Sequence, residues 1–361
     1  MDKSPYKDTL NFYSKLYKFA PQGNLLRRLQ QHVSMIVSCF ETKQSTVDGL
    51  SFSKDDTEKK NSLLTNCKRY LKNKWVDYET FFQPLSIFIL EKIAPKGEMI
   101  FVIDGSQIGN HTVLMISVLW KNMAIPIIWT LREGEKGHFS EEMHVDLFHQ
   151  LARLTPNHCR CVLLGDGEFD GFDLRTVCLK NKWEFVLRTS KNCKIKCGDE
   201  IGKVSEAYPA AGEEVFMIPD AVDGIHLIGW HTATYEQPIY LITNMDLAEM
   251  ACEYYKRRFQ IESMFKRMKS HGFNIHKTKI TLTDRLNRLL IVTCAAYLLL
   301  AEFGRFLKET ITPTQIQHIV AKDRLSKMTF LTIAWKAFKA DIKLALFFFS
   351  EIANNPNCFF T

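Results

Sequence analysis

The sequence predicts an α/β fold in which a mixed β-sheet is flanked by helices, with a β-rich insertion and helical N- and C-terminal regions. Three observations lead to this prediction. Apolar residues recur at helical spacing up to about residue 96, apolar runs typical of strands follow, and helical spacing returns after about residue 246. The 361 residues, 46% of them hydrophobic, are enough to bury one large core or two moderate ones.

The charge balance favours a polyanionic partner. The formal net charge is +7, and the basic residues occur in clusters, as in nucleic-acid-binding proteins but also on ordinary lysine-rich surfaces. The ten cysteines form no paired C-x-x-C spacing, which favours free thiols over disulfides or zinc ligands. The first residues lack the apolar core of a signal peptide, and the longest apolar run, Leu289 to Ala301, is too short to span a bilayer. We therefore expect a cytoplasmic protein with no membrane partner.

The first 96 residues are expected to be helical. The stretches NLLRRLQQHVSMIVSCF and FFQPLSIFILEKI carry apolar residues at helical spacing. Between them, the basic segment TEKKNSLLTNCKRYLKNKW makes Lys68 and Arg69 candidate phosphate contacts, and the turn before it suggests helix-turn-helix geometry. A solvated helix face without a ligand is the open alternative.

Strands are predicted from Met99 onward. The runs MIFVIDGS, TVLMISVLW and AIPIIWTLR have short links, so they should form an antiparallel meander. A helix, the strand in CRCVLLGD, a second helix and the strand WEFVLRTS follow, which gives the order βββαβαβ. A strand reached through a helical crossover normally runs parallel to its neighbour. Residues 190–245 then hold short strand-like pieces around Gly- and Pro-containing turns, which indicates a β-rich insertion.

Two aspartates end predicted strands. Asp104 ends the first strand and Asp166 ends the fourth. If these strands are parallel neighbours, both carboxylates emerge at the same sheet edge, where α/β sheets place their sites. A single strand-end Asp is more often a cap or turn residue. Glu168 and Asp170 follow closely, but Asp166 is preferred because it directly follows the apolar strand.

A third acid lies within the basic segment YYKRRFQIESMFKRMKSHGF. On one continuous helix, Tyr255, Arg258, Glu262 and Lys269 would share a stripe beside an apolar face that can pack on a core. The ordinary alternative is a solvated helix on which Arg258 and Glu262 form an i,i+4 ion pair.

Three clustered carboxylates repel one another, so such a site calls for bound cations or raised pKa values. Oxygen-only ligation by Asp104, Asp166 and Glu262 suits Mg²⁺ or Mn²⁺. Two such ions can activate an attacking oxygen and stabilise the leaving oxygen of a phosphodiester displacement.

The spacing of Tyr255, Arg258, Glu262 and Lys269 resembles the Y-R-E-K signature of the insertion-sequence DDE transposases of the family numbered four, which have an RNase H-like catalytic core. The resemblance covers Met99 to about Leu300, and the apolar run after the signature is also similar. The N-terminal region matches much less distinctly.

The resemblance implies a catalytic and metal-binding triad of Asp104, Asp166 and Glu262 with two Mg²⁺ or Mn²⁺ ions. The other signature residues would contact DNA. It implies cut-and-paste transposition, with cleavage at element ends and strand transfer into target DNA by a homodimeric synaptic complex in the nucleoid. Trp230 in the insertion is the candidate for stacking on a flipped base, although a strand tryptophan more often belongs to a core.

The expected organisation has five parts: a helical N-terminal region (1–96), the first part of the catalytic core (97–189), the β-rich insertion (190–245), the remainder of the core (246–303) and a helical C-terminal region for dimerisation (304–361). Two alternatives to an active transposase stay open. One is a transposase-derived DNA-binding protein without catalysis. The other is an RNase H-like nuclease or resolvase, which would share the metal site but would not need the Tyr, Arg and Lys of the signature.

Overall fold

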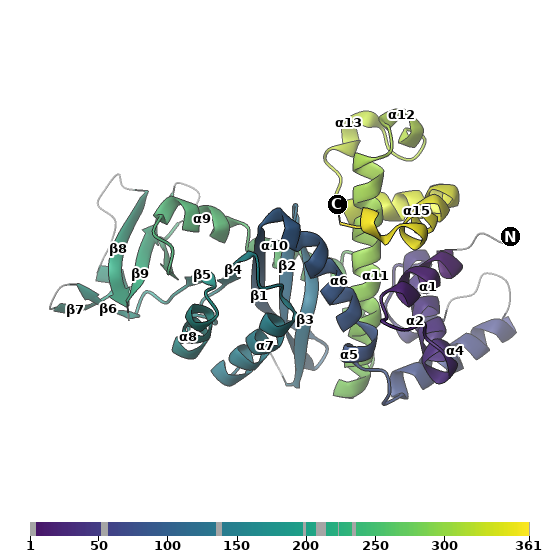
Figure 1. Ribbon diagram of the computed structural model, residues 1–361, viewed down its shortest axis with the longest axis horizontal. Helices are drawn as coiled ribbons and strands as arrows, with labels where there is room; N and C mark the ends of the chain where they lie inside the picture. Colours follow the sequence, from purple (N-terminus) through teal and green to yellow (C-terminus); the bar gives the residue numbers. More distant parts are fainter. Residues whose placement is uncertain are drawn as a thin grey trace.

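The computed structural model describes residues 5–51, 57–134, 139–197, 200–206, 214–222, 224–232 and 236–360. The molecule is elongated, with a sheet-containing half and a helical half (Figure 1). The described helices are α1 (Pro5–Lys15), α2 (Gly23–Thr42), α3 (Val47–Leu50), α4 (Thr57–Lys72), α5 (Tyr78–Phe81), α6 (Gln83–Ile93), α7 (Glu141–Leu154), α8 (Phe172–Lys180), α9 (Ala248–Lys256), α10 (Phe259–Met268), α11 (Thr283–Glu309), α12 (Pro313–Ile316), α13 (Lys322–Leu325), α14 (Phe330–Ala340) and α15 (Ile342–Asn354).

The described strands are β1 (Glu98–Ile108), β2 (His111–Trp120), β3 (Met123–Glu133), β4 (Arg160–Gly165), β5 (Glu184–Arg188), β6 (Lys194–Cys197), β7 (Glu200–Lys203), β8 (Val215–Val222), β9 (Ile225–Trp230) and β10 (Ile239–Thr243). Single 3-10 turns are η1 (Ala94–Lys96), η2 (Val204–Glu206), η3 (Ile275–Lys277) and η4 (Pro356–Cys358).

The central sheet has eight strands in the order β3-β2-β1-β4-β5-β10-β9-β8. Strands β1, β2 and β3 pair antiparallel, whereas β1, β4 and β5 pair parallel. This confirms the predicted meander, the order βββαβαβ and the RNase H-like mixed sheet flanked by helices. All ten residues of β2 are buried, which explains why its sequence is a continuous apolar run instead of an alternating one.

Helices cover both faces of the sheet. On one face, Trp183 stacks on Phe101 of β1 and makes an edge contact with Phe148 of α7. On the other face, α10 packs against β1 and β3. The part of the sheet that holds β1 and β3 therefore lies between α7 and α10.

The insertion predicted at 190–245 is rich in strands, but most of it continues the central sheet. Strands β10, β9 and β8 add antiparallel to β5 one after another, and only β6 and β7 form a separate pair. Figure 1 shows these strands at the end of the molecule opposite the helical half.

The two terminal regions pack together around α11. This helix contacts α2 and α4 from the N-terminal region and α14 and α15 from the C-terminal region, while α1 packs on α15. The predicted boundary after residue 303 falls inside α11, so that boundary does not separate two folded units. The turn before the basic helix α4 lies at 52–56, outside the described residues, and its helix-turn-helix geometry stays a prediction.

The apolar run predicted to be a buried helix lies within α11. This helix has 27 residues and is long and apolar enough to cross a membrane, but 94% of its most apolar stretch is buried inside the protein. Helices α2, α4, α14 and α15 supply the apolar side chains that cover it. The run is thus a core helix of the helical half, longer than the sequence pattern alone indicated.

Candidate active site at the edge of the sheet

The register of two parallel strands brings Asp104 and Asp166 together. Val102 of β1 pairs with Leu164 of β4. Asp104 lies two residues after Val102 on β1, and Asp166 lies two residues after Leu164, directly after the last residue of β4. Because side chains two residues apart point to the same face of a sheet, the two carboxylates emerge side by side on one face. This is the arrangement that the strand-end pattern predicted.

Close packing fixes the backbone just before Asp166. A Cβ at Gly165 would lie 2.9 Å from the Cβ of Phe169 and 3.0 Å from a methyl carbon of Leu187, distances that real Cβ atoms do not tolerate. A larger residue would therefore push β4 away from its neighbours and shift the aspartate that follows. The Asp166 carboxylate in turn accepts a hydrogen bond from the Glu168 backbone N–H at 3.0 Å.

The two acids that follow Asp166 are engaged elsewhere. Glu168 accepts a hydrogen bond from the Phe139 backbone N–H at 2.8 Å. Its other carboxylate oxygen lies 4.0 Å from where a Cβ of Gly105 would be, on the sheet face opposite Asp104. Asp170 accepts a hydrogen bond from the Thr189 hydroxyl at 2.7 Å. These contacts support the choice of Asp166 as partner of Asp104.

The predicted single helix is wrong in one respect: the segment from Tyr254 to Phe273 is interrupted. Helix α9 ends at Lys256, and α10 starts at Phe259. Between them the Arg258 N–H donates to Tyr255 O at 3.0 Å, a tight i to i+3 bond of the 3-10 type. The reason is tertiary packing, because α9 rests on β5 and β8 while α10 rests on β1 and β3.

Three of the four signature residues still lie side by side across this break. The Arg258 guanidinium lies 5.6 Å from the centre of the Tyr255 ring, and its Nη2 donates to Glu262 Oε1 at 2.5 Å. Lys269 is not on the regular helix, because it follows the last residue of α10 with ψ −112. The i,i+4 pair foreseen as the ordinary alternative is therefore present, together with the Tyr255 ring.

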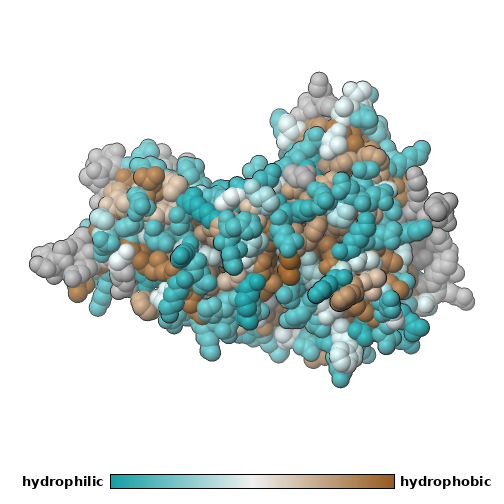
Figure 2. Space-filling model, viewed as in Figure 1, coloured by the Kyte–Doolittle hydropathy of each residue, from teal (hydrophilic) through white to brown (hydrophobic). Residues whose placement is uncertain are grey.

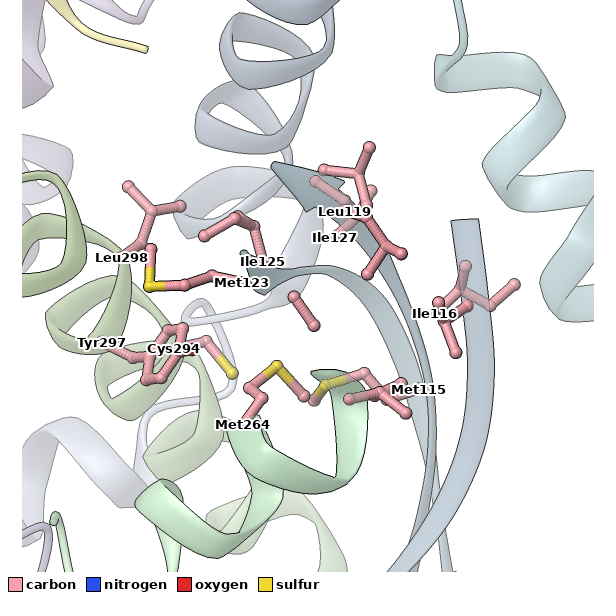
Figure 3. Close-up of a cluster of buried hydrophobic side chains, with 14 of the residues drawn as sticks. Met115, Ile116, Leu119, Met123, Ile125, Ile127, Met264, Cys294, Tyr297 and Leu298 are labelled. Atoms are coloured by element: carbon pink, nitrogen blue, oxygen red, sulfur yellow. The ribbon is translucent and has the colours of Figure 1, made fainter. Parts of the chain in front are cut away.

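Apolar contacts seat α10 on the acid-bearing face. Met264, two residues after Glu262, accepts a weak hydrogen bond from the Ser117 hydroxyl of β2 at 3.5 Å. Figure 3 shows Met264 beside Met115, which pairs in register with Asp104. Cys294 and Tyr297 of α11 close the same cluster in Figure 3. The hydrophobic core thus holds the helix that carries Glu262 against the strand that carries Asp104.

Of the three acids, Asp104 is buried, Asp166 is half-buried and Glu262 is exposed. The pKa of Asp104 is raised to about 6, mainly by burial, then by the Asp166 carboxylate and to a smaller degree by Glu262. Arg258 and a hydrogen bond from the Gly105 N–H act in the opposite direction. Burial alone would lower the pKa of Arg258, but Tyr255 and Glu262 hold it above its usual value.

The carboxylates fit a hard divalent cation in their chemistry, since they offer only oxygen ligands and the Asp166 carboxylate raises the pKa of Asp104. Their arrangement is incomplete for one. Within the described residues, no group of three or more His, Cys, Asp and Glu side chains is close enough to hold a metal ion. The Glu262 carboxylate forms an ion pair with Arg258 and is not grouped with the two aspartates.

A cleft of about 590 Å³ opens beside Asp166. Its wall includes Arg188 and Lys191, which the sequence interpretation missed, together with Tyr240 of β10. The only local signal for these two basic residues was the polar end of the strand WEFVLRTS. Figure 2 shows that the outline of the molecule is also hollowed on its upper side, between the insertion strands and the projection that carries α12 and α13.

Trp230 lies at the end of β9 and is only 2% exposed. It pairs with Ile239 of β10, and the Lys256 ammonium lies 5.4 Å from its ring centre. The ring is closed to a stacked base in this conformation, which favours the core role. Base stacking by Trp230 stays a prediction.

The N-terminal candidates lie apart from the acids. Lys68 and Arg69 are exposed on the last turns of α4. Arg69 borders a cleft of about 580 Å³ together with Arg28 and Trp75. Trp75 is 60% exposed, and Arg28 and Lys74 lie 6.0 and 5.4 Å from its ring centre. The sequence interpretation named the two α4 residues and missed Trp75, whose only signal was its place at the end of the basic segment.

Comparison with known proteins finds a region that is similar to a transposase domain. Residues 141–299 match the family model described as Transposase DDE domain, a segment that contains Asp166 and Glu262 but begins after Asp104. The search of curated proteins gave no match. A search of solved structures found a piggyBac transposase in a cryo-EM synaptic complex with hairpin DNA, with a TM-score of 0.45 and 9% identity, covering 97% of this chain and 82% of that chain. The family match thus gives this mixed α/β protein a region similar to a transposase DDE domain.

Proposed function

We propose that this protein is a DDE transposase, which cleaves DNA at insertion-sequence ends and joins the freed ends to target DNA. The observation that carries the proposal is the shared register of Asp104 and Asp166 on the sheet face covered by α10, the helix that brings Glu262. Two strand-end acids and one helix-borne acid at one sheet edge are the components of a phosphodiester-cleaving centre. The match of residues 141–299 supports the same reaction class.

Asp104 and Asp166 would hold the divalent cations, with Mg²⁺ or Mn²⁺ favoured by their oxygen ligands and two ions expected. When bound, such ions activate an attacking oxygen and stabilise a leaving oxygen. Glu262 would complete the ligand set after release from Arg258. The raised pKa of Asp104 supports this role, because a cation would relieve the repulsion between its carboxylate and Asp166.

The basic residues of the signature would hold the DNA backbone. Arg258 is beside the acids, and once Glu262 releases it the guanidinium can bind a phosphate with two hydrogen bonds. Lys269 follows α10 and would supply a second phosphate contact. Arg188 and Lys191, in the cleft beside Asp166, suit the phosphates of nucleotides next to the scissile bond.

The partners we propose are double-stranded DNA, namely element ends and target, and a second copy of this chain in a homodimeric synaptic complex. The exposed Lys68 and Arg69 are proposed DNA contacts outside the active site. The place of action would be the cytoplasm, in association with the nucleoid.

One observation favours a second candidate, a transposase-derived DNA-binding protein without catalysis. Glu262 is paired with Arg258 and does not join Asp104 and Asp166 in a three-carboxylate group. In that case the pair would only stabilise the helix, by a few tenths of a kcal/mol.

The deciding experiment is to incubate the protein with Mg²⁺ and DNA that carries the flanking ends of its own element. An active transposase yields both excision and strand-transfer products. Cleavage without joining would support an RNase H-like nuclease or resolvase, and binding without either product would support the non-catalytic candidate.

A further inference from the structure

A basic pocket lies on a different side of α10 from the acids. It is a pocket of about 640 Å³ between the end of α2, the outer side and C-terminal loop of α10, and the start of α14. The residues that line it are Thr42, Lys43, Ser263, Lys266, Arg267, Ser270, His271, Gly272, Asn274, Thr329, Leu331, Thr332, Trp335 and Lys336. The pocket therefore joins the N-terminal region, the proposed catalytic core and the C-terminal region.

Backbone contacts build this pocket. The Ser45 N–H donates to Phe273 O at 2.6 Å, and the Asn274 amide donates to Lys43 O at 3.4 Å. A Cβ at Gly272 would lie 2.3 Å from Arg267 O and 2.9 Å from the Trp335 ring, so this position requires glycine. The loop after α10 is thus tied to the end of α2 and pressed against α14.

Positive charge gathers in the lining of the pocket. Lysine or arginine side chains come from α2, α10 and α14, and none of the described residues that line the pocket is Asp or Glu. Burial lowers the pKa of Lys43, and the nearby ammonium groups of Lys339 and Lys336 lower it further. Lys43 and the two lysines of α14 therefore repel each other, a cost that a bound anion would relieve.

The wall also offers uncharged donors. Ser263, Thr332 and Ser270 line the pocket, and serine and threonine hydroxyls commonly bond phosphate oxygens. The Lys43 ammonium lies 5.2 Å from the centre of the Trp335 ring. The buried Trp335 Nε1 has no hydrogen-bond partner within the part of the chain that the structure describes.

We propose that this pocket, with Lys43 and Lys336 at its core, binds backbone phosphates of the DNA strand that leaves the acids along α10; this inference rests on the proposed function. Ser263 directly follows Glu262, and Lys266 lies one turn beyond it, a rise of about 6 Å. Successive phosphates of one strand can therefore pass from the signature residues to the pocket. The pocket would fix the direction in which DNA leaves the active site.

Two substitutions remove the charges without disturbing the backbone. Lys43 has φ 56, a left-handed conformation that asparagine adopts more readily than most residues, so Lys43→Asn keeps the end of α2. Lys336 is exposed on α14, and Lys336→Gln keeps helix propensity. Lys180→Gln, at the exposed end of α8, is the matched control.

Binding of a labelled duplex that carries an element end is measured by fluorescence anisotropy over a range of salt. Each pocket variant should lower the slope of log affinity against log salt by about 0.9, and affinity by about eightfold at roughly 0.1 M salt. The double variant should lose about twice the slope, and the control should match wild type. Thermal melting of each variant establishes that it is folded.

The outcomes separate this inference from the proposed function. Unchanged slopes in folded pocket variants overturn the phosphate pocket, even if Asp104→Asn abolishes cleavage as expected. The wild-type protein could instead bind DNA through Lys43 and Lys336 but neither cleave nor join it. That result supports the phosphate pocket and contradicts the proposed transposase function. Equal slope losses in the control and the pocket variants also overturn it, because the effect would then be one of net charge.

Discussion

The two flanks of α10 differ in the sign of the charge that they concentrate. On one flank, burial and Asp166 raise the pKa of Asp104 to about 6. On the other, burial and two lysines lower the pKa of Lys43. Like charges repel in both places, so the protein alone bears a cost that a ligand of opposite sign would offset. In the two proposals above, the same helix lies between acids that would hold metal cations and lysines that would hold the DNA.

The largest expected effect concerns the acidic flank. Asp104→Asn and Asp166→Asn keep the shape of the side chains but remove the charge that holds metal. We expect each to lower DNA cleavage by more than about a hundredfold, since changes in residues that only support a metal ligand already cost ten- to a hundredfold. A gel assay of end cleavage measures this, and DNA affinity should stay near wild type. Full activity in either variant would remove that residue from the site.

Asp104→Asn should lower cleavage, but it should raise the stability of the folded protein. Because the pKa of Asp104 is raised in the folded state, the folded protein holds this proton more tightly, and the free energy of unfolding falls as pH rises from about 4 to about 6. Above about pH 6, the full destabilisation by the charged Asp104 carboxylate is present. In EDTA at about pH 8, Asp104→Asn should therefore stabilise the protein by about 1 to 3 kcal/mol.

Denaturant unfolding at several pH values checks this stability prediction. The gain should disappear below about pH 4, where the aspartic acid is protonated in both states. A variant that is less stable than wild type at about pH 8 would show that Asp104 is not held against uncompensated negative charge.

Divalent cations should remove part of this cost in the wild-type protein. At ten times its dissociation constant, Mg²⁺ should add about 1.4 kcal/mol to the free energy of unfolding, and Asp104→Asn should lose most of that gain. Ca²⁺ should also bind but support little cleavage, because its looser coordination aligns the attacking oxygen poorly. Thermal melts with each ion measure the binding without relying on activity. Equal shifts in wild type and variant would place the cation elsewhere.

A smaller effect distinguishes the signature residues near the acids. Arg258→Ala should lower the salt slope of DNA binding by about one unit, because it removes a charged phosphate contact. Tyr255→Phe should change the slope little, since only a hydroxyl is lost while the ring against Arg258 is kept. Anisotropy titrations over several salt concentrations compare the two variants. Equal slopes for both would argue against a phosphate contact by Arg258.

Much of the fold could be predicted because it rests on local patterns and on the rules of strand connection. Apolar runs gave β1 to β5, and the right-handed crossover rule placed β4 parallel to β1. The shared edge of Asp104 and Asp166 followed from that pairing. The joining of β8, β9 and β10 to the same sheet did not, because nothing local specifies that the insertion pairs with β5.

The break between α9 and α10 could not be foreseen. The two residues between the helices are Arg257 and Arg258, not the Gly or Pro that usually interrupts a helix. The apolar residues keep their helical spacing through the break. The kink arises because the two helices rest on different strands of the sheet. The basic pocket was equally hidden, since Lys43 and Lys336 are far apart in the sequence and meet only when the two ends of the chain pack around α11.

The most direct test of the central claim uses Glu262→Gln, measured for DNA binding and for cleavage in the same preparation. Glu262 is paired with Arg258 at 2.5 Å, so the same side chain could serve either as a helix-stabilising ion pair or as a metal ligand. If it is a metal ligand, the variant binds element ends at least as well as wild type, because an acid leaves a basic surface, yet it loses cleavage and strand transfer. Near-normal cleavage by Glu262→Gln would contradict the account.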